Sequence, residues 1–591
     1  MAEHFDTPLQ RGIAALRGIL GEDAASALLR PIATRADEAA SFTFPLPVDY
    51  MGEERRLRIV FPSNFPQRQL ELLVEPSPWL VWPHAMENGL CLHGFREKPI
   101  TGSPETMVED SFSRLGRIID LSRAGSDDAR RDAEFQREIT TYWSRQSGQS
   151  LRNIVLLERP KDASRLFALS DPRNALPSGQ ETVWLAADES RIKRYFERVV
   201  GRASRLRALE CPAFYVKLQT YPDIRVPEAE SLMAWLMEHL TDGDAASFAL
   251  WFNEKGSLVD RWVVIELPGV EGVSNYCFNV HARGIQPNRG TKFGLRSSRR
   301  NPAKVAFNVP ALIRSSTLNI LDRAAILSRD LSGTAQRLES SRVVFVGVGS
   351  LGSAVALQLA RSGVGCMTFI DPDILVSENL GRHTLGADDL GKSKAVALKE
   401  KIIRDLPTVE VTAYKHFSEM IMLLRPEIFN NADLVIVTTA DWESEVALWK
   451  AKVDGAPWGI LQAWSEPHTQ VGHALIAPAG KYDARYLFSD NGDFYHKYTE
   501  WPDGGAISLP ACGESFIPGG SLGMANVASM VSQAALSALT GQLQDTSWFT
   551  SIYRPQDVAT LGGKYCGPQL PDGVQQTVLE RRWPEQREKV T

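Results

Sequence analysis

The chain has 591 residues, of which 43% are hydrophobic and 23% are charged. These proportions are ordinary for a globular protein, and a chain of this length predicts three or four domains. The net charge of −6 argues against broad binding to nucleic acids or membranes, so we expect neither as a partner.

Residues 1–148 predict an α+β domain. The expected elements are, in order, a helix over residues 5–30, strands over 41–47, 56–61 and 70–75, and helices over 105–123 and 128–146. Proline-rich turns separate the strands, and an extended loop then carries Cys91 between His84 and His93. On this pattern alone, Cys91 could equally be a buried structural thiol, which is common for a free cysteine.

This order of elements resembles the ubiquitin-conjugating domain. The local matches are Phe61-Pro62, Phe65-Pro66 and Gly89-Leu90-Cys91-Leu92. The resemblance implies that Cys91 is catalytic and carries an acyl group as a thioester. The His-Pro-Asn triplet that usually precedes this cysteine is missing, so the residue that stabilises the tetrahedral oxyanion stays open among His84, Asn88 and His93.

Residues 149–316 predict a middle α+β domain. Strand-like runs lie at 153–157, 182–187, 214–218, 261–267 and 276–280, and helical patterns lie near 190–207 and 228–240. Such a domain could position two catalytic units or recognise a partner, and the sequence does not decide between these roles.

A third domain is predicted over residues 317–591, beginning with a helix over Leu318–Leu327. Its clearest pattern is a strand from Arg342, a turn through Gly347, Gly349 and Gly352, a helix, and a second strand that ends at Asp371. These elements make half of a dinucleotide fold, in which the helix N-terminus faces a phosphate and the acid reaches a ribose hydroxyl. Alone, the motif also fits a nicotinamide or flavin site.

The residues after Asp371 favour a nucleoside triphosphate. Asn379, Arg382 and Lys394 follow it, and Asp441 ends a later strand that begins at Asp433. A site that breaks a polyphosphate needs cations near the developing charge, whereas hydride transfer has no evident need for them. A carboxylate at the carboxyl end of such a strand can hold Mg²⁺. The pattern therefore predicts ATP and Mg²⁺ as cofactors.

This ordered set resembles the ThiF-like adenylyltransferases, the superfamily that includes the ubiquitin-activating enzymes. The match runs over residues 317–545 and includes Cys512-Gly-Glu-Ser-Phe. The resemblance implies a doubly wound Rossmann-like fold, adenylation of a C-terminal glycine carboxylate, and capture of the acyl group on Cys512. In this family an arginine before the first strand reaches the partner subunit's ATP site, and Arg323 and Arg329 are both candidates; either could equally be a surface charge.

The chain contains six cysteines. Cys512 stands shortly before a helix, whose dipole could lower the thiolate pKa, although an inert loop thiol is the alternative. The absence of any Cys-x-x-Cys pair predicts that there is no zinc site. The remaining four are interpreted as structural: Cys211, Cys277, Cys366 and Cys566.

Two uncharged segments, 343–360 and 515–544, are long enough to cross a membrane. The glycine turn interrupts the first, and Pro518 and Asn526 interrupt the second, so we interpret both as buried parts of the nucleotide fold. The first residues lack a basic stretch followed by an apolar one. We therefore expect a cytoplasmic protein.

The order of conjugating, middle and activating domains resembles the bacterial fusion enzymes of CBASS anti-phage operons, the CD-NTase-associated protein 2 type. This resemblance implies a homodimer and a cGAS/DncV-like nucleotidyltransferase whose C-terminal glycine is joined to a target amine. A ubiquitin-like protein is the alternative partner. A sulfur-carrier adenylyltransferase is a weaker alternative, because it needs neither Cys91 nor the middle domain. Two alternatives from other functional classes also remain open, an NAD(P)-dependent oxidoreductase and a non-catalytic binding scaffold.

Overall fold

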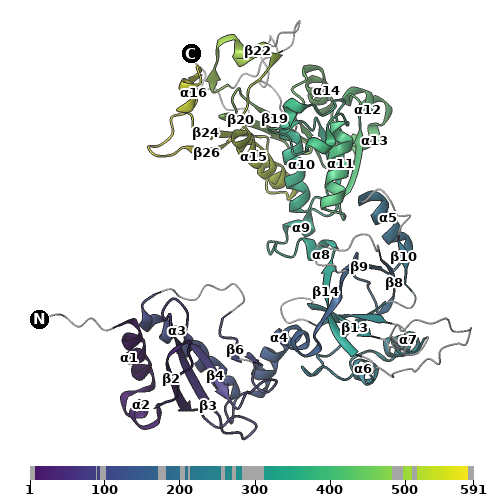
Figure 1. The fold of residues 1–591 in the computed structure, drawn as a ribbon. Coiled ribbons are helices and arrows are strands. Elements are labelled where there is room, and N and C mark those ends of the chain that lie inside the picture. The colour runs from purple at the N-terminus through teal and green to yellow at the C-terminus, as the bar shows by residue number, and fades with distance from the viewer. Residues whose placement is uncertain are drawn as a thin grey trace, which may run out of the picture. The chain divides into compact units, whose positions relative to one another are not determined.

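A computed structural model describes residues 7–87, 89–93, 102–170, 181–199, 206–209, 213–254, 260–268, 274–281, 312–481, 497–508 and 515–583. The chain forms two compact units. The first comprises residues 1–155, 160–188 and 206–319, and the second comprises residues 156–159, 189–205 and 320–591. Figure 1 labels many of the elements of both units. The division into three domains remains a prediction.

The N-terminal part of the first unit is a four-stranded antiparallel sheet with helices before and after it. Its elements are α1 (Pro8–Leu20), α2 (Glu22–Leu28), β1 (Arg30–Pro31), β2 (Glu38–Pro45), β3 (Arg56–Pro62), β4 (Glu71–Glu75), α3 (Pro104–Ser122) and α4 (Asp128–Ser147). The single helix predicted over residues 5–30 is broken at Gly21, which has φ +80°. Only glycine adopts this left-handed conformation at little cost, so one helix ends and the next begins there.

Eight strands form the sheet of the middle part. They are β7 (Gln149–Leu156), β8 (Ser164–Ser170), β9 (Glu181–Ala186), β10 (Arg207–Ala208), β11 (Ala213–Lys217), β12 (Arg261–Leu267), β13 (Ser274–His281) and β14 (Leu312–Ile320). Their order is β10-β8-β11-β12-β13-β14-β7-β9, and β8 also pairs with β9, so strand pairing closes the sheet on itself. Helices α6 (Leu232–Met237) and α7 (Asp242–Asn253) pack on its core.

The helix predicted over Leu318–Leu327 is wrong. Strand β14 runs through Ile320, and only the four-residue helix α8 (Arg323–Ile326) lies within the predicted range. The backbone of this segment pairs with strands that are distant in sequence: β14 pairs with β13, and Leu321 N–H donates to Leu156 O at 2.9 Å. Such long-range pairing outweighs a local apolar pattern.

A second eight-stranded sheet forms the centre of the second unit. Its strands are β15 (Arg342–Val346), β16 (Cys366–Ile370), β17 (Glu410–Tyr414), β18 (Leu434–Val437), β19 (Gly459–Ser465), β20 (Val471–Ala477), β24 (Ser547–Tyr553) and β26 (Gln576–Arg582). In the order β17-β16-β15-β18-β19-β20-β24-β26, the first five strands are parallel and the last three are antiparallel. The sheet is therefore α/β in type, as predicted, but mixed rather than wholly parallel.

Helices cover both faces of this sheet. They are α10 (Ser350–Ser362), α11 (Lys394–Asp405), α12 (Ser418–Leu424), α13 (Pro426–Asn430), α14 (Trp442–Val453) and α15 (Ser521–Leu539). In β15, Val343 and Phe345 join one buried core, while Val344 and Val346 join the other. A strand buried on both faces needs a continuous apolar run, which is the pattern of this segment.

Shorter elements complete the two units. They are α5 (Glu189–Val199), α9 (Thr334–Arg337), α16 (Asp557–Thr560) and the short pairs β5 (Ala85–Met86) with β6 (Gly89–Leu90), β21 (Thr499–Glu500) with β25 (Lys564–Tyr565), and β22 (Ile507–Ser508) with β23 (Ser515–Phe516).

Helix α15 is long and apolar enough to span a membrane, by length and composition alone, and it is the one such helix among the described residues. It packs against the sheet instead. Its side chains Val527, Ala528 and Val531 are buried in the same core as Val343, and Ser532 Oγ donates to Gln358 Oε1 of α10 at 2.7 Å. These contacts agree with the interpretation of this segment as a core helix.

Candidate active site

The turn between β15 and α10 requires glycine at two positions for different reasons. Gly347 has φ +86°, and a Cβ on it would lie 2.9 Å from the backbone of Thr438. A Cβ on Gly352 would lie 2.3 Å from the Gly347 oxygen and 2.5 Å from Thr438 Oγ1. Around Gly349, by contrast, a Cβ would meet nothing within 4 Å, and no side chain caps α10 there. The N-terminus of α10 is therefore open to a phosphate.

We expect Gly352→Ala to destabilise the second unit by about 3 kcal/mol or more, because the added methyl group must displace backbone atoms. Gly349→Ala is the matched control. It should unfold like the wild type but bind ATP more weakly, since its methyl group enters the open space at the helix N-terminus. Urea unfolding and ATP titration of both variants check these outcomes. Equal stability of the two variants would show that the turn tolerates a side chain at residue 352.

The carboxylate of Asp371 holds this turn in place. Its Oδ2 accepts the N–H of Val348 at 2.8 Å, and its Oδ1 accepts the N–H of Asp373 at 2.8 Å. Only 5% of Asp371 is exposed, and burial raises the pKa of its carboxyl group. The predicted contact with a ribose hydroxyl remains a prediction, and it would use the lone pairs that these two N–H groups leave.

His383 is a second support of the turn, and the sequence pattern did not single it out. Its Nε2 lies 2.8 Å from Val348 O, and Leu385 N–H donates to its Nδ1 at 3.1 Å. Burial lowers the pKa of His383. Because Nδ1 accepts a hydrogen bond, the ring is neutral and its proton lies on Nε2. His383 therefore binds the backbone oxygen of Val348, while Asp371 binds the backbone N–H of the same residue. Its position directly after Arg382 is the one signal that could have suggested it.

Arg382 keeps part of its hydrogen-bonding capacity free. Its Nη1 donates to Ile517 O at a long 3.4 Å, and within the described part of the chain its buried Nε has no hydrogen-bond partner. A buried donor without a partner is costly. An anion placed beside this guanidinium would remove that cost and would meet the fork of donors that suits phosphate.

Lys394 and Asn379 lie on the segment that continues from Asp371. Lys394, which is 8% exposed, begins α11, and its Nζ contacts Asp373 Oδ2 at 2.8 Å. Asn379 shapes a short turn: its side-chain oxygen accepts the Val376 N–H at 3.3 Å. Its backbone oxygen accepts the His383 N–H at 2.9 Å. The exposed carboxylate of Asp373 thus holds the Lys394 side chain near Asp371.

Asp441 stands at the carboxyl end of β18, where it caps α14. Its Oδ2 accepts the Ser444 N–H at 3.1 Å, and the residue is exposed. Among the described residues no group of three or more His, Cys, Asp or Glu side chains is placed to hold a metal ion. A nucleotide-bound Mg²⁺ usually keeps several waters and takes one or two carboxylates besides the phosphates. The single exposed carboxylate of Asp441 fits this requirement.

Glu445 lies one turn of α14 beyond Asp441 and was missed by the sequence pattern. It is 5% exposed, and burial raises the pKa of Glu445 to about 7. Thr439 Oγ1 donates to its Oε1 at 3.4 Å. Nothing in the sequence distinguishes this glutamate from a surface residue of the same helix.

The two candidate arginines before β15 differ in the structure. Arg323 Nη2 donates to Ala335 O at 2.6 Å and also to Gly363 O, and it forms an ion pair with Glu339 at 3.9 Å. Arg329 is exposed, two residues before Leu331, which is 95% exposed. The Arg323 side chain therefore already binds groups of its own chain. Arg329 makes the better candidate for a contact with another subunit.

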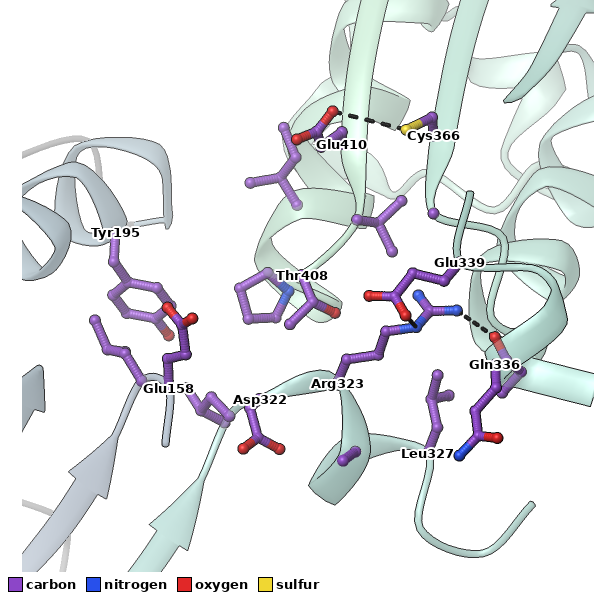
Figure 2. Close-up of a pocket in the computed structure, with 18 of the residues that line it drawn as sticks. Glu158, Tyr195, Asp322, Arg323, Leu327, Gln336, Glu339, Cys366, Thr408 and Glu410 are labelled. Carbon is purple, nitrogen blue, oxygen red and sulfur yellow. Dashed lines mark hydrogen bonds and ion pairs between the residues drawn. The ribbon is translucent and has the colours of Figure 1, made fainter. Parts of the chain in front are cut away.

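A cavity of about 1250 Å³ lies beside Arg323 (Figure 2), and no residue of the glycine turn lines it. Its wall includes Cys366 and Glu410, which begin β16 and β17, whereas the glycine turn follows the end of β15. Cys366 Sγ lies 3.7 Å from Glu410 Oε2, and burial raises the pKa of this thiol. This cavity lies at the amino-terminal ends of the parallel strands, whereas the glycine turn lies at their carboxyl ends. It is therefore not the nucleotide site.

Cys91 follows the short hairpin of β5 and β6. Its N–H donates to His84 O at 2.6 Å, and its thiol lies 3.5 Å from His93 O. The His84 ring lies between two glutamates, so its nitrogens are occupied. Neither ring nitrogen of His93 has a hydrogen-bond partner among the described residues. His93 therefore remains available for the oxyanion role, while Asn88 lies outside the described residues.

Cys512 also lies outside the described residues, as does Cys211. The strands that flank the Cys512 segment, β22 and β23, pair through Ile507 with Phe516 and Ser508 with Ser515. Of the other cysteines, Cys277 is fully buried, and burial raises the pKa of its thiol, which agrees with a structural role. Cys566 is exposed.

The sequence of this chain is similar to those of several known proteins. Residues 321–552 match the family model described as ThiF family. The adenylyltransferase/sulfurtransferase MoeZ of Mycobacterium tuberculosis is 28% identical over 252 residues, which cover 40% of this chain and 58% of MoeZ. The ATP-dependent ubiquitin transferase-like protein Cap2 of Escherichia coli is 33% identical over 126 residues, which cover 20% of each chain.

Among solved structures, Escherichia coli MccB with ATP is 18% identical, covers 36% of this chain and 59% of its own, and has a TM-score of 0.26. The matches in sequence agree with the predicted ThiF-like domain in the C-terminal region and with the predicted resemblance of the chain to the Cap2 group of relatives. This chain spans less than two thirds of the length of MoeZ, Cap2 and MccB in these matches.

Proposed function

We propose that this protein activates the C-terminal carboxylate of a partner protein with ATP and passes the acyl group through two cysteines to an amine. The observation that carries the proposal is the buried Nε of Arg382, which has no hydrogen-bond partner among the residues that the structure describes. It lies in the same segment as His383, which holds the glycine turn through Val348. A guanidinium left with a free donor beside a turn that is open to phosphate suits ATP better than a nicotinamide.

In the first step, a carboxylate oxygen of the partner attacks the α-phosphorus of ATP, and the bond to pyrophosphate breaks. In this proposal Arg382 and Lys394 neutralise the charge that develops on the phosphates. Asp371 would bind the ribose while it holds the turn, and Asp441 would hold the Mg²⁺ that accompanies the nucleotide. That ion, when bound, supplies further charge neutralisation on the phosphates. The products are an acyl-adenylate and pyrophosphate.

The acyl group then moves through two thioesters. The Cys512 thiolate attacks the acyl carbon and AMP leaves, after which the Cys91 thiolate attacks and Cys512 leaves. Finally, a target amine attacks the Cys91 thioester, loses a proton, and leaves an amide and the free Cys91 thiolate. Sulfur suits this relay because it is both a good nucleophile and a good leaving group. Two thiols on one chain reach an effective concentration of roughly millimolar.

For the partner we propose a cGAS/DncV-like nucleotidyltransferase with a C-terminal glycine, in cytoplasmic antiviral defence of the CBASS type. This choice rests on the resemblance of the domain order to the CBASS fusion enzymes, and a ubiquitin-like protein remains the alternative. The relatives named ATP-dependent ubiquitin transferase-like protein Cap2 support a protein substrate of either kind. The target amine is a lysine in this proposal. A homodimer is also proposed, and the exposure of Arg329 supports it, because this arginine could serve the second subunit's site.

The adenylation step is tested by ATP–pyrophosphate exchange in the presence of the partner. We expect wild-type protein to catalyse the exchange and Asp441→Ala to lower its rate about tenfold or more at limiting Mg²⁺, because one ligand of the ion is lost. Raising the Mg²⁺ concentration should recover part of the rate. A rate that is unchanged in Asp441→Ala at every Mg²⁺ concentration would remove this residue from the site, and a wild type without exchange would refute adenylation.

A further inference from the structure

The imidazole ring of His84 lies between two carboxylates of helix α4. Its Nδ1 is 2.9 Å from Glu138 Oε1, and its Nε2 is 3.4 Å from Glu134 Oε2. The three side chains are between 20% and 27% exposed, so water screens these contacts only in part. Both ring nitrogens therefore face acceptors, and a ring with two acceptors satisfies both only when it carries two protons.

The backbone of His84 is joined directly to Cys91. In the hairpin, Ala85 pairs with Leu90 and Met86 with Gly89, so His84 and Cys91 stand at its open end. The Cys91 N–H donates to His84 O at 2.6 Å. His84 has φ +59°, a left-handed conformation that costs free energy for a residue with a side chain. A side chain held from two sides can offset that cost.

Helix α4 is fixed independently of this hairpin. Its residues Ile139 and Trp143 are buried in the core of the middle sheet. One turn beyond Glu138, the fully buried Tyr142 packs on Trp79 at 5.5 Å between ring centroids. Any group that binds Glu134 and Glu138 is thus fastened to a helix that is rooted in the middle core and also contacts Trp79 of the N-terminal part.

We propose that His84 is a positioning residue which, as an imidazolium, fastens the Cys91 hairpin to helix α4. The contact would give the middle part of the chain a role that its sequence did not reveal, since one wall of the Cys91 site comes from a helix rooted in the middle core. The proposal rests on the proposed function only where it treats Cys91 as the acyl carrier. The fastening itself needs neither ATP nor a partner.

The charges around His84 set the direction of its pH dependence. From α4 it faces Glu134, Glu138 and the hydroxyl of Tyr142, which donates to Glu138 Oε2 at 3.3 Å, and Arg137 pairs with Glu134 at 2.7 Å. On the hairpin, the Cys91 N–H donates to the backbone oxygen of His84. The hydrogen bond to Glu138 raises the pKa of His84 above its usual 6.5, while burial opposes this shift. The fastening is therefore complete below that usual value and is lost as the pH rises through the raised one.

Amide hydrogen exchange of the peptide that contains the Cys91 N–H tests the proposal on the full chain without ligands. Protection, corrected for the intrinsic rate at each pH, should fall roughly threefold to tenfold in the wild type between about pH 6 and pH 9, the size expected for losing charge-assisted contacts that are partly exposed. His84→Gln should show the low protection throughout. His84→Lys, which stays charged over this range, should show no fall.

His281→Gln is the matched control, because His281 also faces an acid, Asp260 at 3.4 Å, but lies in β13. It should leave the protection of the Cys91 peptide unchanged. Glu138→Gln provides a second variant if His84→Gln fails to fold, and it should reduce protection at about pH 6. Wild-type-like protection in His84→Gln or in Glu138→Gln, or a fall of the wild-type size in His84→Lys, would overturn the proposal. None of these readouts depends on adenylation, so failure of the proposed function would leave them unchanged.

Discussion

Arg382→Ala is expected to slow ATP–pyrophosphate exchange by ~10²- to 10³-fold, the usual cost of removing one group that stabilises charge in a transition state. The physical reason is the free donor capacity of its guanidinium, whose buried Nε has no partner among the described residues. The side chain as a whole is only partly buried, but this one nitrogen is shielded from water, so its interaction with a phosphate would be screened less than that of a fully exposed donor. Exchange rates measured at saturating ATP separate this effect from weaker nucleotide binding.

Two variants sharpen this prediction. Arg382→Lys retains the charge but loses the fork of donors, so it should recover only part of the rate. Arg425→Ala removes an exposed arginine that pairs with Glu427 at 2.6 Å, and it should exchange like the wild type. If Arg382→Ala exchanged at the wild-type rate, this residue would be a structural contact of Ile517 and no more.

Cys91→Ala is expected to abolish amide formation on the target while leaving ATP–pyrophosphate exchange unchanged. The proposed adenylation site lies within residues 321–552, which match the ThiF family, and Cys91 lies outside them. Without the Cys91 thiol, no second acceptor stands beside the target amine, so the acyl group should stay on Cys512 as a thioester. Mass spectrometry of the chain under non-reducing conditions detects that adduct, and a gel of target conjugates measures the loss.

Cys512→Ala is the complementary variant. It should still exchange pyrophosphate but form no thioester on the chain, and an adduct on Cys91 in this variant would mean that the acyl group reaches it directly from the adenylate. Cys277→Ala serves as a control, because this thiol is fully buried in the middle sheet. Normal target conjugation by Cys91→Ala would reduce the N-terminal part of the chain to a docking module.

Local patterns made the adenylation fold predictable. The apolar run, the glycine turn and the acid at Asp371 are each fixed within a few residues, and β15, α10 and β16 lie where they were expected. Features that depend on distant partners were not predictable. The closure of the middle sheet requires β8 and β9 to meet, and the strand at Ile320 requires β13, so neither could be inferred from nearby residues.

The same distinction applies to the site. Residue types suggested which groups could meet a phosphate, but not which contacts they already make. Asp371 holds two backbone N–H groups, and both ring nitrogens of His84 face carboxylates. His383 and Glu445 matter because of burial, which a sequence without aligned relatives does not reveal. The roles of Cys512 and Asn88 stay predictions, since both lie outside the described residues.

The C-terminal sheet ends in strand β26, which pairs only with β24 among the described strands. An edge strand offers unpaired N–H and C=O groups, on which the strand of another molecule can add. Its last three residues, Glu580, Arg581 and Arg582, are all charged, and the Arg582 side chain is 88% exposed. The side chains of a strand that paired with β26 would lie beside these three charged side chains. Charged side chains on an edge strand disfavour such addition, so we expect residues 580–582 to oppose aggregation at this edge of the sheet.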